Sequence, residues 1–120
     1  MFRILLDHNV PATLRKHLSK HEVRTAAEEG WGQISNGVLI SRAEAAGFQV
    51  LLTCDQNIKY QQNLSKRVIS LVVLGSNIWP SVQPHLAEIA KAVDRAVPNS
   101  FEFMEITPLP RRRRMQGPPI

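Results

Sequence analysis

Cysteine is nearly absent from this sequence, and so are long apolar runs. Cys54 is the only cysteine, so an intrachain disulfide is excluded and the cytoplasm is the expected compartment. No stretch approaches the roughly 18 apolar residues that a membrane-spanning helix needs. Arg3 and Asp7 interrupt the N-terminus early, which argues against a secretory signal. We therefore expect a cytoplasmic protein with no membrane partner.

Net charge is concentrated in one short segment. The chain of 120 residues carries a formal charge of +5, and Arg111–Arg114 contribute four of its fifteen Lys and Arg residues. Without them, 11 basic residues face 10 acidic ones, which leaves +1. We expect one folded domain over residues 1–107, followed by a disordered basic tail rich in Pro and Arg over residues 108–120. This tail either attracts phosphate nonspecifically or is simply solvated.

Apolar segments with strand character alternate with segments of helical spacing. Strands are predicted over residues 2–6, 21–25, 49–53, 68–74 and 101–106, the last at an edge of the sheet. Helices are predicted after Pro11, from residue 36 to a stop at Gly47, over residues 56–66 and over residues 85–97, with a loop over residues 75–84. This alternation predicts an α/β fold with a mostly parallel sheet of about five strands and helices on both faces.

Two of the predicted strands end in the same way. Ile4-Leu5-Leu6 leads into Asp7-His8-Asn9, and Val50-Leu51-Leu52-Thr53 leads into Cys54-Asp55-Gln56-Asn57. Parallel strands share one carboxyl end of the sheet, where ligands bind in open α/β folds. Asp7 and Asp55 are therefore expected to be neighbours in space. The alternative is that each aspartate only caps the helix that follows it.

A pair of close carboxylates favours a divalent cation, because the bound charge relieves their repulsion. Mg²⁺ prefers oxygen ligands and often uses one or two carboxylates together with water and substrate phosphate. Asn9, Asn36 and Asn57 offer neutral oxygens or hydrogen bonds to metal-bound water. The predicted site therefore has Asp7 and Asp55 as ligands of Mg²⁺ or Mn²⁺, with chemistry directed at a phosphodiester.

The same motifs resemble a known family. Ile4–Pro11 is similar to the opening of PIN-like proteins of the DUF5615 type, and Thr53–Ile58 is similar to the end of their third strand. Gly30-Trp31-Gly32, Asn36–Leu39 and the segment from Tyr60 to Leu64 resemble one subgroup of that family. The resemblance covers about residues 2–75; beyond them it extends only to the order of the elements.

The resemblance implies a three-layer, Rossmann-like PIN sandwich and a Mg²⁺-dependent ribonuclease, the toxin half of a VapC-like toxin–antitoxin pair. Asp7, Asn36, Asp55 and Asn57 would form the catalytic group, with RNA as substrate and an antitoxin as partner; a homodimer stays open. PIN nucleases usually gather three or four acids, whereas positions 36 and 57 are Asn here. Glu28, Glu29 or Glu44 could supply a missing acid, but ordinary solvated positions are the simpler expectation.

RNA contacts are expected from residues around the two aspartates. His8 and Asn9 follow Asp7, and Lys59 and Tyr60 follow Asp55, with packing or solvent exposure as the alternative for each. Two other functions remain open. One is a catalytically weak PIN-like module that binds a protein, which the missing acids favour. The other is a receiver-like phosphoacceptor, although the first strand provides one acid rather than two and no Lys ends the last strand.

Overall fold

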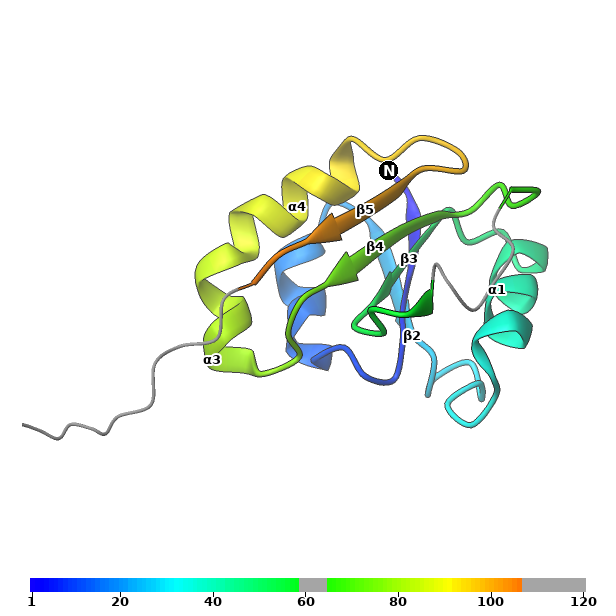
Figure 1. The fold of residues 1–120 in the computed structure, drawn as a ribbon, viewed down its shortest axis with the longest axis horizontal. Coiled ribbons are helices and arrows are strands. Elements are labelled where there is room, and N and C mark those ends of the chain that lie inside the picture. The colour runs from blue at the N-terminus through cyan, green and yellow to red at the C-terminus, as the bar shows by residue number, and fades with distance from the viewer. Residues whose placement is uncertain (59–64, 107–120) are drawn as a thin grey trace, which may run out of the picture.

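The protein folds around one parallel sheet. The computed structural model describes residues 1–58 and 65–106. Its strands are β1 (Arg3–Leu6), β2 (Glu22–Thr25), β3 (Val50–Thr53), β4 (Ser70–Leu74) and β5 (Phe101–Met104). They run in the order β2-β1-β3-β4-β5, and every neighbouring pair is parallel (Figure 1). The α/β fold with a parallel, five-stranded sheet is therefore confirmed.

The sequence explains which strands lie inside the sheet. β3 and β4 are continuous apolar runs apart from Thr53 and Ser70, and every residue in both is buried. Such runs are typical of parallel strands covered on both faces. β2 and β5 are only partly buried and form the two edges, so the prediction that the last strand is an edge strand is confirmed.

Among the residues that the structure describes, five helical segments accompany the sheet. They are the 3₁₀ helix η1 (Ala12–Leu18), α1 (Asn36–Ala45), α3 (Trp79–Val82), the 3₁₀ turn η2 (Gln83–His85) and α4 (Leu86–Asp94). Within residues 1–58 and 65–106, no helix is long and apolar enough to cross a membrane.

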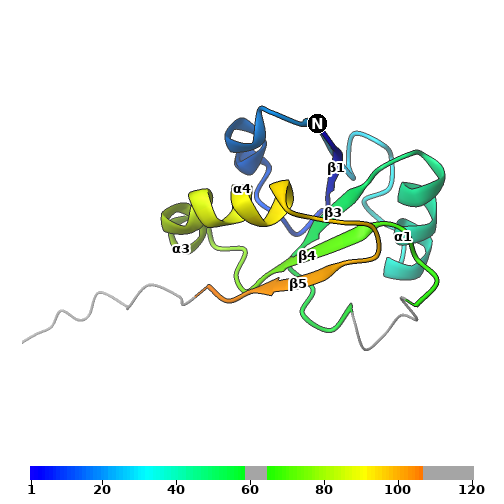
Figure 2. The same ribbon diagram turned by 90° about the horizontal axis from the view of Figure 1, so that it is seen from above.

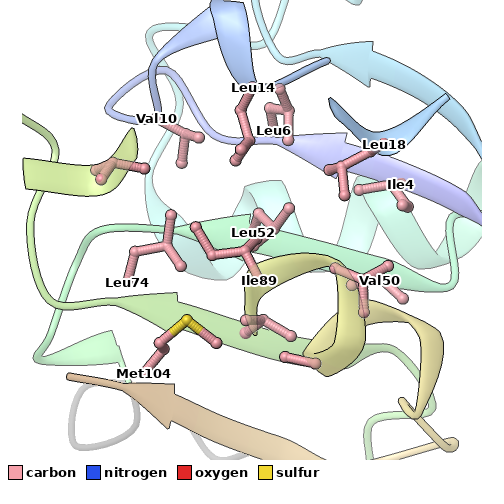
Figure 3. Packing of buried hydrophobic residues seen from close by; sticks show 14 of the residues in the cluster. Ile4, Leu6, Val10, Leu14, Leu18, Val50, Leu52, Leu74, Ile89 and Met104 are labelled. Carbon is pink, nitrogen blue, oxygen red and sulfur yellow. The ribbon is translucent and has the colours of Figure 1, made fainter. Parts of the chain in front are cut away.

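The core is divided into two apolar clusters by the sheet. Successive strand residues point to opposite faces, so Ile4 and Leu6 join one cluster while Leu5 joins the other. The first cluster includes Leu14 of η1 and Ile89 of α4 (Figure 3). The second cluster packs beneath α1. Figure 2 shows η1, α3 and α4 on one side of the sheet and α1 on the other.

Several predicted boundaries differ from the structure at prolines. The loop predicted over residues 75–84 contains α3 and the first part of η2, because Pro80 and Pro84 each occupy the first turn of a helical segment. Proline loses no hydrogen bond there. The predicted helix over residues 85–97 ends at Asp94, ahead of Pro98. The helix predicted after Pro11 is present as the 3₁₀ helix η1.

The predicted helix over residues 56–66 lies largely outside the described residues, as do Lys59, Tyr60 and the tail over residues 108–120. The stop predicted at Gly47 is confirmed. This glycine has a φ of 87°, and its N–H donates to the carbonyl of Glu44, just beyond the end of α1. A left-handed glycine is the usual way to close a helix.

Gly75 allows β4 and the chain after β5 to approach each other closely. Its N–H donates to the carbonyl of Met104 at 2.9 Å. A Cβ atom at Gly75 would lie 2.9 Å from the backbone nitrogen of Ile106 and 3.2 Å from the carbonyl oxygen of Met104. Both contacts are with backbone, which cannot rotate out of the way.

We therefore expect Gly75→Ala to lower the free energy of unfolding by about 1–3 kcal/mol, the usual effect of overpacking. Urea denaturation measures this change. Gly32→Ala is the matched control, because a Cβ atom at Gly32 would meet nothing within 4 Å. Equal stability of the two variants would show that the approach at Gly75 is not tight in solution.

Candidate functional site at the carboxyl end of the sheet

The two predicted aspartates follow neighbouring strands. β1 and β3 pair from Ile4↔Val50 to Leu6↔Leu52, and the N–H of Asp7 extends the ladder by donating to the carbonyl of Leu52 at 2.9 Å. From β1 the chain goes on to β2 on one side, and from β3 to β4 on the other. Ligands of open α/β sheets bind outside the carboxyl ends of two strands related in this way.

Asp7 is buried and hydrogen-bonded at both carboxylate oxygens. The residue is 3% exposed. Its Oδ1 accepts from the backbone N–H of His8 at 2.7 Å and lies 2.9 Å from Nδ1 of the same histidine. Its Oδ2 accepts from the Thr53 hydroxyl at 2.8 Å. These donors offset the cost of placing a carboxylate out of contact with water.

Three hydrogen bonds, two of them to its carboxylate, hold Asp55 in place. Its Oδ1 accepts from the backbone N–H of Asn57 at 3.0 Å, the side-chain-to-backbone turn typical of aspartate. Its Oδ2 accepts from the side-chain amide of Asn36, the first residue of α1. Its own N–H donates to the hydroxyl oxygen of Thr53 at 3.1 Å.

Thr53 thus connects the two aspartates. Its hydroxyl donates to Asp7 and accepts from the backbone of Asp55, and the residue is fully buried. Sequence reasoning included Thr53 in the motif and gave it no role of its own. The available signal was a hydroxyl residue at the last position of an otherwise apolar buried strand, two residues before Asp55.

The other predicted residues are arranged around this connection. The side-chain amide of Asn36 donates to the carboxylate of Asp55, as described above. The side-chain oxygen of Asn9 accepts from the N–H of Cys54 at 3.0 Å. His8 extends outward from Asp7 with 59% of its side chain exposed, and Asn57 is exposed. Lys59 and Tyr60 are not among the residues that the structure describes.

The three glutamates considered as extra acids are bound elsewhere. Glu44 accepts from the N–H groups of Val68 and Ile69 at the start of β4, which is the amino end of the sheet. Glu28 pairs with Arg15, and this hydrogen bond is the main reason that its pKa falls to about 2. Glu29 pairs with Arg24 at 2.6 Å.

A divalent cation bound between Asp7 and Asp55 would have to keep much of its water. Within residues 1–58 and 65–106, no group of three or more His, Cys, Asp and Glu side chains could hold a metal ion. Asp7 and Asp55 provide hard carboxylate oxygens, and Mg²⁺ can be held by two carboxylates if water and substrate phosphate complete its shell. The same oxygens already accept hydrogen bonds from the protein, so the ion would share them.

Cys54 directly precedes Asp55 in the sequence, but its thiol is not activated as a nucleophile. Burial raises the pKa of its thiol to about 12, and the negative charge of Asp7 adds to the shift. Its Sγ donates to the carbonyl of Ser76 at 3.5 Å. Because the thiolate is the reactive form, Cys54 serves here as a small packing residue, as the sequence indicated.

Comparisons with family models, with curated proteins and with solved structures find no match to this chain. The family resemblance of the sequence motifs therefore stays a prediction.

Replacing Thr53 should show how much the connection contributes to stability. Thr53→Val keeps the shape but removes the donor to Asp7, so we expect a loss of about 1–3 kcal/mol in the free energy of unfolding. Thr53→Ser keeps the hydroxyl and removes one methyl group, so a loss of about 1 kcal/mol is expected. Urea denaturation compares the two. A valine variant at least as stable as the serine variant would contradict the proposed bridge.

Alkylation of Cys54 should be slow in the folded protein. With the pKa raised from an ordinary 9.0 to about 12, the thiolate fraction falls by about three orders of magnitude. We expect iodoacetamide at pH 8 to modify the native chain about three orders of magnitude more slowly than the urea-unfolded chain. Mass spectrometry follows the reaction. Similar rates in the two states would contradict a buried thiol.

Proposed function

We propose that this protein is a metal-dependent, PIN-like ribonuclease whose centre is formed by Asp7 and Asp55. One observation carries the proposal: two carboxylates follow the paired strands β1 and β3 and are connected through the hydroxyl of Thr53. This is the position at which an open parallel sheet with this strand order binds its ligands. The sequence resemblance to PIN-like nucleases supports the same reaction.

Each residue of the centre has a separate part in the proposed chemistry. Asp7 and Asp55 would hold Mg²⁺ or Mn²⁺, and Asn36 and Asn57 orient the carboxylate of Asp55. When bound, the ion supplies an activated water and neutralises charge on the phosphodiester. His8, exposed beside Asp7, would contact a substrate phosphate.

A protein-binding module with little or no catalysis is the second candidate. The observation that favours it is the hydrogen bonding of all four carboxylate oxygens of Asp7 and Asp55 within the protein. Asn at positions 36 and 57 lowers the negative charge further. The partner would be an antitoxin in the toxin–antitoxin reading of the family resemblance, or a second copy of the chain.

The test is cleavage of a fluorescent single-stranded RNA by the full-length protein during a Mn²⁺ titration. We expect metal-dependent cleavage that Asp7→Asn and Asp55→Asn each reduce by about 100-fold or more. Asp94→Asn is the matched control, since Asp94 ends α4 and pairs with Lys20 and His21 at the amino end of the sheet. Its activity should equal that of the unmodified protein.

The other candidate functions predict different results. Absence of cleavage together with absence of thermal stabilisation by Mn²⁺ would reject the nuclease and leave the binding module. Labelling of Asp55 by a small phosphodonor would indicate a receiver-like phosphoacceptor instead. Cleavage that persists in both aspartate variants would reject Asp7 and Asp55 as the catalytic centre.

A further inference from the structure

The hydrogen-bond ladder between β1 and β3 reaches past the last residues of the two strands. The N–H of Asp7 donates to the carbonyl of Leu52, which is the partner of Leu6 in the register. In a regular parallel ladder, the next bond joins the carbonyl of residue 7 to the N–H of residue 54. Asp7 and Cys54 would therefore be bonded through their backbones if both strands went on without a turn.

Both of these backbone groups have other partners, because the chain turns after Asp7. The carbonyl of Asp7 accepts from the N–H of Val10 at 3.0 Å, which closes the turn. The N–H of Cys54 donates to the side-chain oxygen of Asn9 at 3.0 Å. Because an N–H group can only donate, the oxygen of the asparagine amide is the atom that faces Cys54. Asn9 thus supplies the acceptor that the backbone of a straight strand would have supplied.

This bond joins the two loops that carry the candidate centre. Asn9 lies two residues after Asp7, and Cys54 directly precedes Asp55. The hydroxyl of Thr53 connects the aspartates at the end of β3, whereas Asn9 connects their loops beyond the strand ends. Cys54 is partly buried against the first apolar cluster, so its N–H depends on a partner from the protein. Loss of the Asn9 oxygen would free the segment that begins at Cys54 to move away from Asp7.

We propose that Asn9 is a positioning residue, which fixes the carboxylate of Asp55 relative to that of Asp7 through the backbone of Cys54. The consequence for metal binding rests on the proposed function. Mg²⁺ demands nearly ideal octahedral geometry, so two carboxylates can share the ion only at a fixed separation. Groups that orient metal ligands without touching the metal typically change its affinity by about 10–100-fold.

Amide hydrogen exchange of the full-length, metal-free protein tests the bond itself, with NMR detection. Asn9→Leu keeps nearly the same shape and removes the acceptor. We expect the N–H of Cys54 to exchange about tenfold faster in this variant, as the loss of one hydrogen bond predicts. The N–H of Asp7, bonded one step earlier in the ladder, should keep its rate. Asn9→Asp keeps an acceptor oxygen at the same place and should preserve the protection of Cys54.

The matched control is Asn77→Leu, the same change at an exposed asparagine between β4 and α3. It should leave the exchange of Cys54 unaltered. Unaltered exchange of Cys54 in Asn9→Leu as well would overturn the inference. Equal acceleration at Cys54 and Asp7 would also overturn it, because Asn9 would then stabilise the fold as a whole without holding this loop in particular.

Mn²⁺ affinity is the measurement that a purely structural role would leave unchanged. We expect Asn9→Leu to weaken Mn²⁺ binding by about 10-fold or more, as measured by calorimetry, while Asn77→Leu binds as the unmodified protein does. In the cleavage assay, Asn9→Leu should need more Mn²⁺ for half-maximal activity. Its KM for RNA at saturating Mn²⁺ should equal that of the unmodified protein, because the variant disturbs the centre and not the contacts with RNA.

The two readouts separate this inference from the proposed function. In Asn9→Leu, the NMR amide signals of Asp55 and Asn57 should shift in the absence of metal, because the loop after β3 moves. Such shifts together with faster exchange at Cys54, in a protein that neither binds Mn²⁺ nor cleaves RNA, would reject the nuclease and keep the inference. Mn²⁺-dependent cleavage with an unchanged Mn²⁺ affinity in Asn9→Leu would reject the inference and keep the nuclease.

Discussion

The hydroxyl of Thr53 and the buried carboxylate of Asp7 form the contact on which the site depends. A carboxylate that is 3% exposed is costly unless donors surround it. Thr53 meets that need from β3 and, with its lone pairs, receives the N–H of Asp55. The same contact therefore stabilises the start of the loop after β1 and sets the direction of the loop after β3.

This contact requires the parallel sheet around it. Thr53 reaches Asp7 only because β1 and β3 are neighbours in a register that aligns Leu6 with Leu52. The same register places alternate strand residues in the two apolar clusters. A shift by one residue would move each strand's side chains to the opposite face of the sheet. One arrangement of the strands therefore both buries the apolar side chains and brings Thr53 next to Asp7.

The candidate site consists of two carboxylates whose hydrogen-bonding capacity is largely used by the protein itself. Each carboxylate oxygen of Asp7 and Asp55 accepts a hydrogen bond within the protein. In the proposed nuclease, such a centre would depend on its substrate to complete the shell of a metal ion.

Local pattern was sufficient for much of this protein. The apolar runs that become β1, β3 and β4, the stop at Gly47 and the placement of Asp7 and Asp55 at one end of the sheet follow from residue type and spacing, because parallel strands share a carboxyl end. The tertiary structure alone decided the strand order, the bridging role of Thr53, the use of Asn9's oxygen by Cys54 and the position of Glu44 at the opposite end. The bonds of Thr53 to Asp7, of Cys54 to Asn9 and of Arg67 to Glu44 join residues 23 to 46 positions apart, and no local pattern carries that information.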